Sequence, residues 1–261
     1  LKVAQAFRDE VRQRGLQDKV AVRQTGCHGF CERGPIVVLQ PKGIFYQRLQ
    51  LADVPEVVTK TVLGNELIER LLYIDEATGK KIAAEHDVPF YKKQKRLILG
   101  GNGFIDPTDL GDYLALDGYK ALQRVLSGMS PEAVIAEVSA SGLRGRGGAG
   151  FPTGRKWDIC RSIACDLKYV VCNADEGDPG AYMDRSLLEG NPHSVLEGMI
   201  IGAYAIGARE GFVYVRNEYP LAVENVTKAV EACRKQGLLG KGILGSKLDF
   251  DVKIFKGAGA F

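Results

Sequence analysis

The sequence has little net charge, few histidines and no long apolar run, and each of these shortages excludes a class of protein. Its 35 basic and 32 acidic side chains leave a net charge of +3, too small to indicate a nucleic-acid or membrane partner. In the most apolar part of the sequence, the longest stretch without a charged residue is Gly198 to Ala208. This is well short of the roughly 18 residues that a membrane helix needs. The three histidines, His28, His86 and His193, show no spacing typical of a metal or catalytic pair, and we expect them to be structural.

The rest of the composition is that of a globular protein, except that glycine is unusually frequent. Apolar residues make up 45% and charged residues 26%, so disorder and a coiled coil are poor interpretations. The length of 261 residues suits about two domains. Glycine contributes 32 residues, or about 12 per cent against an average near 7 per cent. Such enrichment often brings the backbone close to a ligand.

Both ends of the sequence are predicted to lie inside domains. Leu1 to Leu16 has the apolar periodicity of an amphipathic helix and lacks the charged, apolar and small-residue pattern of a targeting signal. Asp249 to Phe255 is predicted to be a strand, and Gly257 to Phe261 has the composition of a ligand loop. We therefore expect a fragment of a longer protein, cut inside one domain at each end.

Residues 1–64 are predicted to form a small α/β domain. A hairpin is closed by Pro41-Lys42-Gly43, with glycine at the left-handed position. Asp53 caps a helix that ends at Gly64. The predicted strands are residues 19–24, 35–40 and 44–49, with a Gly/Cys loop at 25–34. Residues 65–105 are the candidate linker, with one short helix at 66–73 and a basic extended stretch at 91–96.

Residues 106–261 are predicted to form a second domain in which helices and strands alternate. A strong helix start lies at Ser130-Pro131-Glu132, with serine as the cap and proline in the first turn. The predicted elements that follow are a helix at 154–164, a strand at 168–173, a helix at 192–208, a strand at 211–216, a helix at 220–236 and a strand at 249–255. This alternation predicts parallel strands with right-handed crossovers, and ligands of such sheets bind at the carboxyl ends of the strands. Three segments are therefore candidates for a site: 173–184, 216–218 and 257–261.

Six glycines stand within the thirteen residues from Gly142 to Gly154, beside the cations Arg144, Arg146, Arg155 and Lys156. Bare backbone can curl around a phosphate or lie under a ring, and fixed cations neutralise the phosphate. Residues 145–150 fit G-x-G-x-x-G, but a helix precedes them where a dinucleotide fingerprint needs a strand, so a simple Rossmann fingerprint is rejected. A purely structural glycine turn and an RGG-type nucleic-acid segment are alternatives. A nucleotide or flavin loop is favoured.

Asn173 to Gly180 follows the first strand of the predicted sheet and carries the carboxylates of Asp175, Glu176 and Asp178. Carboxylates and amides can accept hydrogen bonds from ribose or ribityl hydroxyls and from the N–H edge of a ring. A solvated turn with a helix cap is the alternative, whereas the spacing does not fit a calcium loop. The place of the segment at the end of a strand favours a ligand loop.

Cys27 and Cys31 are separated by three residues in a Gly-rich loop, a spacing that suits a metal or iron–sulfur site. A cluster needs four thiolates, and the other ligands could precede Leu1. A disulfide is disfavoured without a secretory signal. The remaining cysteines are expected to be buried small apolar side chains: Cys160, Cys165, Cys172 and Cys233.

The sixteen residues from Gly142 to Trp157, GLRGRGGAGFPTGRKW, resemble the flavin loop of NADH-oxidising flavoprotein subunits. This family includes the flavoprotein of respiratory complex I and the diaphorase subunits of NAD-linked hydrogenases and formate dehydrogenases. Residues 173–180 and 257–261 resemble its second and third motifs, in the right order. Gly-Asp-Pro-Gly-Ala at 177–181 and a fused amino-terminal domain look more like the hydrogenase and formate dehydrogenase branch.

Residues 1–64 resemble the carboxyl-terminal part of a thioredoxin-like [2Fe–2S] domain, in which Cys27 and Cys31 would be the second pair of metal ligands. The expected fold class is therefore α/β. It comprises a partial thioredoxin-like ferredoxin domain followed by a Rossmann-like, parallel-sheet FMN/NADH-binding domain that is truncated on its carboxyl-terminal side.

The resemblance implies a role for individual residues of the second domain. The residues that would hold FMN at the Gly-rich loop are Gly145, Arg146, Gly147 and Lys156. Those that would line the ribityl chain and ring edge are Asn173, Asp175, Glu176 and Gly177, with Phe261 beside the flavin. Phe151 would stack on the nicotinamide side, and Asp178 would contact NADH. Glu176 would be the catalytic side chain, tuning the ring electrostatically. Two positions depart from the complex I pattern, which has Glu at Asp178 and an aromatic at Ile159.

The activity implied is that of an NADH dehydrogenase or diaphorase subunit, which passes hydride from NADH to FMN and single electrons on to iron–sulfur clusters, or the reverse. The cofactors FMN, NAD(H) and [2Fe–2S] would carry the chemistry, with a [4Fe–4S] cluster expected in the missing carboxyl-terminal part. The expected partners are other iron–sulfur or catalytic subunits of an oxidoreductase, with no nucleic acid and no membrane span. The expected location is the cytoplasm, free or peripheral on a membrane complex. The alternative is a non-catalytic nucleotide- or flavin-binding subunit of such a complex.

Overall fold

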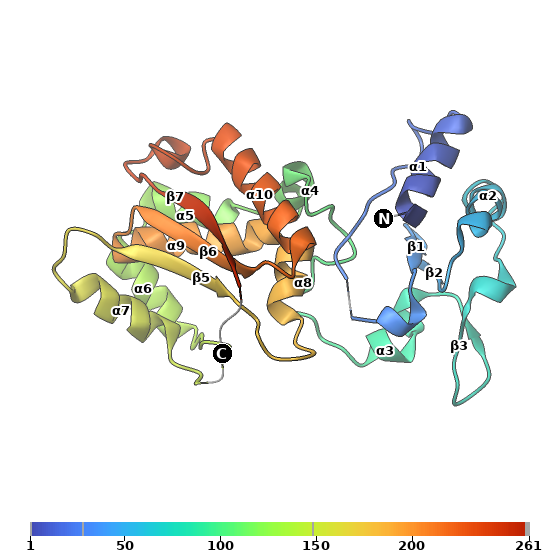
Figure 1. The fold of residues 1–261 in the computed structure, drawn as a ribbon, viewed down its shortest axis with the longest axis horizontal. Coiled ribbons are helices and arrows are strands. Elements are labelled where there is room, and N and C mark those ends of the chain that lie inside the picture. Colours follow the sequence, from blue (N-terminus) through green and yellow to red (C-terminus); the bar gives the residue numbers. More distant parts are fainter. Residues whose placement is uncertain (1, 28, 148, 259–261) are drawn as a thin grey trace. The chain divides into compact units, whose positions relative to one another are not determined.

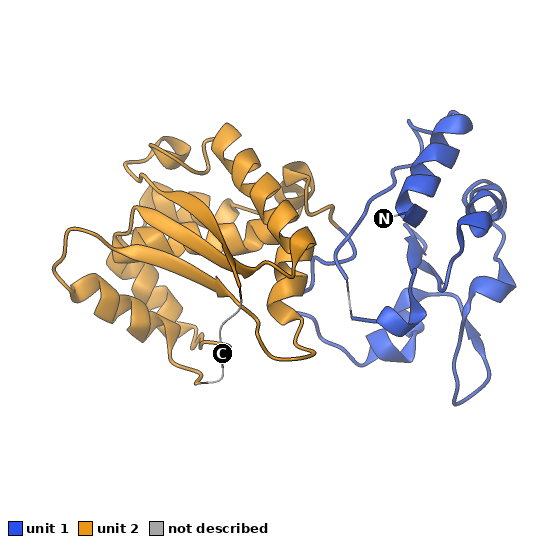
Figure 2. Ribbon diagram, viewed as in Figure 1, with its two compact units in different colours: residues 1–104 blue, residues 105–261 orange. Residues whose placement is uncertain are grey.

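The computed structural model describes residues 2–27, 29–147 and 149–258, and the chain divides into two compact units, residues 1–104 and 105–261 (Figure 2). Each unit has its own buried apolar core. Both units combine helices with strands, so the predicted α/β class is confirmed.

The first unit is built from short helices and two antiparallel two-stranded sheets (Figure 1). Its elements are α1 (Lys2–Gln13), β1 (Val37–Leu39), β2 (Ile44–Tyr46), α2 (Val54–Glu56), β3 (Tyr73–Ile74), β4 (Lys81–Ile82) and α3 (Pro89–Lys92). Val38 lies opposite Phe45 in the β1–β2 hairpin, and Gly43 has a φ of 65°, so the predicted hairpin with a left-handed glycine is confirmed. A π-helix, Val57–Leu63, continues α2 and ends at Gly64, as predicted.

Two local predictions for the first unit are wrong. The structure assigns no strand to residues 19–24, and no described strand pairs with this segment. The short helix predicted at 66–73 is reduced to one 3-10 turn, Glu69–Leu71, because Tyr73 pairs with Ile82 in the second hairpin. In the second case, strand pairing in the hairpin overrode the local helical pattern.

The linker was predicted at residues 65–105. In the structure, residues 65–104 of this segment belong to the first compact unit. They supply three of the five buried members of one apolar cluster, which consists of Phe30, Phe45, Tyr73, Val88 and Tyr91. The stretch 91–96, predicted to be extended, begins inside α3. Because Phe30 belongs to the Gly/Cys loop, this segment supports the loop that carries Cys27.

The second unit contains a three-stranded sheet whose strands are parallel, as predicted, and lie in the order β5-β6-β7 (Figure 1). Its elements are α4 (Leu110–Ala115), α5 (Lys120–Gly128), α6 (Pro131–Ala140), α7 (Thr153–Ser162), β5 (Tyr169–Ala174), α8 (Met183–Gly190), α9 (Pro192–Ile206), β6 (Glu210–Arg216), α10 (Pro220–Lys235) and β7 (Asp251–Gly257). Ser130 caps α6 by accepting a hydrogen bond from the Ala133 N–H at 3.2 Å, as predicted. Helices α4, α5 and α8 are absent from the prediction.

The two faces of the sheet differ in burial. Along β6, Val213 and Val215 are fully buried in the core that includes α9 and α10, while Phe212 and Tyr214 alternate with them and are half-buried. Such period-two alternation is the pattern of a strand that packs on one face. The helices therefore cover one face, and the carboxyl ends of the strands remain available to loops.

A polar cluster inside the second unit fixes α4 and α5 to α9. The Glu197 carboxylate is buried and accepts hydrogen bonds from Tyr113 Oη at 2.6 Å, Tyr119 N at 2.9 Å and Leu122 N at 3.1 Å. Three donors satisfy a buried carboxylate, which would otherwise be costly in an apolar core. This cluster holds the first two helices of the unit in place.

His193 lies in the same cluster and gives a testable pH dependence. Its side chain is 1% exposed, Nδ1 lies 3.0 Å from Tyr119 Oη, and burial lowers its pKa to about 4. The unfolded chain has an ordinary histidine pKa of about 6.5, so between these values it binds more protons than the folded chain. We expect the free energy of unfolding to fall as pH drops from about 6.5 to about 4, with His193 contributing about 3 kcal/mol of the loss.

Urea unfolding at pH 7 and pH 4 measures this loss. It should shrink in a His193→Asn variant and persist in His86→Asn, because the His86 ring is 79% exposed. Equal losses in both variants would contradict the assignment to His193.

Candidate functional site at the ends of the parallel strands

The Gly-rich loop between α6 and α7 is closed at its neck by backbone hydrogen bonds. Gly145 N donates to Phe151 O at 2.9 Å, and Thr153 N donates to Leu143 O at 2.9 Å. Arg144 Nε also donates to Gly150 O at 2.6 Å across the loop. The neck of the loop is therefore held together by its own backbone and by the side chain of Arg144.

The residues of this loop that were predicted to hold FMN and NADH are exposed. They are Gly145, Arg146, Gly147, Phe151 and Lys156. A Cβ added at Gly147 would meet no atom within 4 Å, so the space beside this glycine is open to a ligand. Arg146 Nη1 donates to Arg144 O at 3.1 Å, which orients its guanidinium within the loop.

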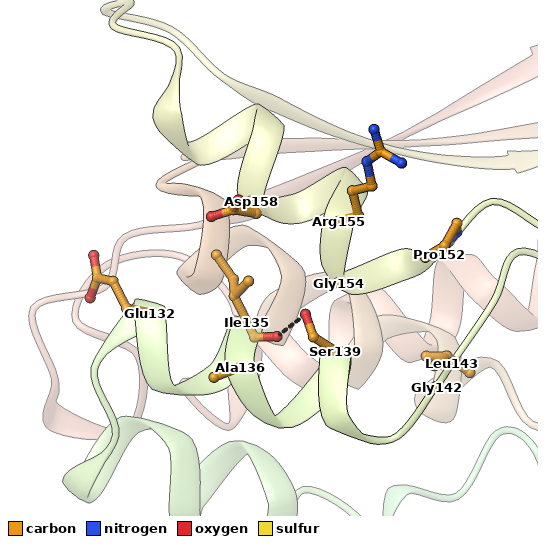
Figure 3. A pocket seen from close by; sticks show the side chains of 10 residues that line it. All are labelled: Glu132, Ile135, Ala136, Ser139, Gly142, Leu143, Pro152, Gly154, Arg155 and Asp158. Carbon is orange, nitrogen blue, oxygen red and sulfur yellow. Dashed lines mark hydrogen bonds between the residues drawn. The ribbon is translucent and has the colours of Figure 1, made fainter.

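Gly154, which lies in the first turn of α7, is required for helix packing and not for an open ligand site. It is buried, and a Cβ there would lie 2.1 Å from Ser139 Oγ and 2.7 Å from Ser139 Cα (Figure 3). Ser139 Oγ itself donates to Ile135 O at 2.8 Å on α6. Without a side chain at Gly154, α7 can lie directly against α6 and carry the loop.

A cavity of about 470 Å³ lies between α6 and α7, beside the base of the loop (Figure 3). Its wall includes Ile135, Ser139, Leu143, Pro152 and Arg155. None of the residues predicted to contact FMN or NADH lines it. No pattern in the sequence indicated this cavity, because its wall combines residues of two helices that the loop separates in sequence.

The acidic loop after β5 is shaped by Glu176. Its carboxylate accepts hydrogen bonds from the N–H groups of Met183 at 2.6 Å, Asp184 at 3.1 Å and Arg185 at 3.1 Å. These are the first residues of α8, whose free N–H groups favour an anion. The side chain of Glu176, which is predicted to be catalytic, caps a helix in the structure.

Asn173 and Asp184 flank this arrangement. Asn173 Oδ1 accepts a hydrogen bond from Asp175 N at 3.0 Å, which turns the chain at the end of β5. Burial and the neighbouring Glu176 carboxylate raise the pKa of Asp184. The predicted set thus begins at Asn173 near the end of β5 and continues in the next loop with Asp175, Glu176, Gly177 and Asp178, where local hydrogen bonds fix the course of the chain.

The ends of all three strands are connected to each other. Arg216 Nη1 and Tyr219 Oη donate to Glu176 O at 3.2 and 3.0 Å, joining the end of β6 to the loop after β5. Asn217 N donates to Gly257 O at 2.9 Å and joins the end of β6 to β7. The three predicted segments therefore meet within one unit. Phe261, the last predicted site residue, lies outside the described residues, as do Gly259 and Ala260.

In the first unit, Cys27 Sγ and Cys31 Sγ lie 4.0 Å apart in an exposed loop. Tetrahedral ligation with metal–sulfur bonds of about 2.3 Å places two sulfurs about 3.8 Å apart, so this pair fits one metal atom. Gly29 N donates to Cys27 Sγ at 3.2 Å, a contact that stabilises a thiolate. No group of three or more metal-ligating side chains occurs among the described residues.

The other cysteines differ in exposure. Cys233 is buried and Cys160 and Cys172 pack against the core, whereas Cys165 is exposed, so its predicted burial is wrong. Cys165 lies beyond the end of α7, in the turn before β5, where the chain runs at the surface. Burial raises the pKa of the Cys233 thiol to about 11, as expected of a structural cysteine. His28 lies outside the described residues.

Comparison with known proteins relates the second unit to a family. Residues 138–261 match the family model described as the Nuo51 FMN-binding domain. A 170-residue stretch is 57% identical to the NADP-reducing hydrogenase subunit HndC of Solidesulfovibrio fructosivorans, covering 65% of this chain and 34% of that protein. A 152-residue stretch is 47% identical to an NADH-quinone oxidoreductase subunit of Rhizobium meliloti, covering 58% of this chain and 36% of that protein.

The resemblance to NADH-oxidising flavoprotein subunits is thereby confirmed, and this chain spans about a third of the length of these relatives. Among solved structures, an NAD⁺-reducing [NiFe]-hydrogenase in the H2-reduced state matches with a TM-score of 0.50 and 25% identity, over 98% of this chain and 40% of that one. Within the described residues, no helix is long and apolar enough to cross a membrane.

Proposed function

We propose that this protein functions as an NADH dehydrogenase or diaphorase subunit. Its residues 138–261 match the Nuo51 FMN-binding domain. It would pass hydride from NADH to FMN and single electrons onward to iron–sulfur clusters, or run in reverse. The observation that carries this proposal is the meeting of the acidic loop with the ends of β6 and β7, since ligands of parallel sheets bind there. The Gly-rich loop adds exposed backbone at Gly145, Arg146 and Gly147.

FMN, when bound, supplies the conversion between two-electron and one-electron transfer. The residues present fit this group, because Gly147 leaves open space and its sequence neighbour Arg146 is exposed on the same loop. The Gly-rich loop would hold FMN through Gly145, Arg146, Gly147 and Lys156. The acidic loop would accept hydrogen bonds from the ribityl chain and ring edge through Asn173, Asp175, Glu176 and Gly177, with Phe261 beside the flavin.

NADH would contact the same site from the Gly-rich loop and the acidic loop. Phe151, whose ring is 44% exposed, would stack on the nicotinamide side, and Asp178 would bind the nucleotide. Glu176 would influence the flavin electrostatically from the N-terminus of α8. Its negative charge is partly neutralised by the three N–H groups, so its field at the ring is weaker than that of a bare carboxylate.

The Cys27 and Cys31 pair would supply half of the ligands of a [2Fe–2S] cluster in a thioredoxin-like domain. The distance of 4.0 Å between the two sulfurs supports this, and the remaining ligands would come from outside this sequence, as would those of a [4Fe–4S] cluster. The partners proposed are other subunits of a hydrogenase, formate dehydrogenase or complex I type assembly, on the cytoplasmic side.

A titration of flavin into the full-length protein, stripped of its cofactors, tests the flavin site. FMN should bind with quenched fluorescence, and riboflavin, which lacks the phosphate, should bind at least about tenfold more weakly because it loses charge-assisted hydrogen bonds. Failure to bind either flavin would contradict the proposed function. Equal affinities for FMN and riboflavin would contradict the proposal that the Gly-rich loop binds the FMN phosphate.

A further inference from the structure

We infer that Arg216 and Tyr219 are positioning residues for the acidic loop, because both donate a hydrogen bond to the peptide carbonyl of Glu176. The inference rests on the proposed function, in which this loop lines the flavin. Neither residue belongs to the set predicted to contact FMN or NADH. Their role would be to fix where the loop's carboxylates and N–H groups lie.

Two donors from one neighbouring segment converge on a single acceptor. Arg216 is the last residue of β6, and Tyr219 precedes the first residue of α10. Their distances to Glu176 O are 3.2 and 3.0 Å, within the range of good hydrogen bonds. A carbonyl oxygen has two lone pairs, so this peptide group has both of its acceptor positions occupied.

The side chain of Glu176 is fixed independently of its carbonyl. Its two carboxylate oxygens accept from the first three N–H groups of α8. The backbone and the side chain of one residue are thus attached to two different elements, the end of β6 and the start of α8. A shift of the Glu176 peptide would therefore move the cap, the helix start and the residues between them.

The two donors are themselves held in orientation. The Arg216 guanidinium makes hydrogen bonds to the Glu218 carboxylate at 3.1 and 3.3 Å, so its charge is already paired and it is a poor candidate for direct anion binding. The Arg185 and Arg216 guanidinium groups lie 5.4 and 5.9 Å from the centre of the Tyr219 ring, within the range of cation–π attraction. Paired charge and fixed ring orientation suit a positioning role.

The variant Tyr219→Phe removes one donor and keeps the ring that faces both guanidinium groups. Tyr204→Phe is the matched control, because Tyr204 Oη also donates to a backbone carbonyl, that of Met129, at 2.6 Å, away from the acidic loop. In the full-length protein we expect Tyr219→Phe to weaken FMN binding about fivefold and to shift the flavin midpoint potential, whereas Tyr204→Phe changes FMN affinity less than about twofold.

Amide hydrogen exchange of the cofactor-free protein gives a second readout that does not need flavin. The N–H groups of Met183, Asp184 and Arg185 should exchange faster in Tyr219→Phe than in the wild type or in Tyr204→Phe. Arg216→Lys, which keeps the charge but loses the fork geometry, should change exchange and affinity in the same direction.

The outcomes distinguish failure of the proposed function from failure of the positioning role. If the wild type binds no FMN, the proposed function fails, and the exchange data still decide whether Tyr219 and Arg216 position the loop. If the wild type binds FMN but both tyrosine variants behave alike in affinity, potential and exchange, the positioning role is overturned.

Discussion

A Gly154→Ala variant is expected to lose about 3 kcal/mol of unfolding free energy, because the added Cβ collides with backbone atoms of Ser139 as well as with its hydroxyl oxygen. The added atom would lie 2.7 Å from both Cα and N of Ser139. Relief requires α7 to move away from α6, and the Gly-rich loop that precedes α7 would move with it. The variant should therefore also bind FMN more weakly.

Gly147→Ala is the matched control within the same loop. A Cβ at Gly147 meets nothing within 4 Å, so the unfolding free energy should change by less than about 0.5 kcal/mol while FMN binding weakens. Urea unfolding of this chain can be followed by Trp157, its only tryptophan, which lies on α7. Wild-type stability for Gly154→Ala would contradict the close packing of α7 on α6.

Glu197→Leu is expected to cost about 4 kcal/mol of unfolding free energy, although leucine is similar in volume and apolar. The substitution leaves Tyr113 Oη, Tyr119 N and Leu122 N without their buried acceptor. Orphaned donors in a core cost more than the hydrogen bonds themselves contribute. The loss should appear as a lower urea midpoint and as early exposure of α4 and α5 in hydrogen exchange.

The variant Tyr113→Phe distinguishes the loss of one hydrogen bond from the loss of the shared acceptor, the Glu197 carboxylate. It removes a single donor to Glu197 and keeps the other two, so the cost should be about 1 kcal/mol. If Glu197→Leu were no more destabilising than Tyr113→Phe, the carboxylate would not be the centre of this cluster.

From residue 131 onward the sequence predicts most of the second unit, because the signals are local. Ser130 and Pro131 start α6, and Gly207 ends α9 in the left-handed conformation. Helix α8 was missed for a physical reason. It has no side-chain cap of its own at Tyr182, and its capping carboxylate belongs to Glu176, seven residues before Met183.

The first unit shows where local patterns fail. Residues 65–104 have weak periodicity, yet Tyr73 and Tyr91 become core residues by packing against Phe30. Such contacts join segments more than forty residues apart, and no window of sequence contains both partners. The predicted linker was therefore a folded part of the unit.

The sequence predicts which segments form the candidate site, but says little about how they are arranged. Sequence pattern selected the Gly-rich loop, the acidic loop and residues 216–218, and the structure joins the last two through Glu176 O. It could not separate Gly154, required by packing, from Gly147, beside which space is open. Nor could it reveal Tyr219, whose hydroxyl acts on a backbone atom 43 residues away.

The most direct test of the proposed electron transfer is the visible spectrum of the full-length protein, purified anaerobically and recorded before and after addition of NADH. We expect a flavin band that bleaches, with iron–sulfur absorbance falling alongside it and iron present in the protein. A protein without flavin, or with a flavin indifferent to both NADH and NADPH, would contradict the proposed activity and favour a non-catalytic nucleotide-binding subunit.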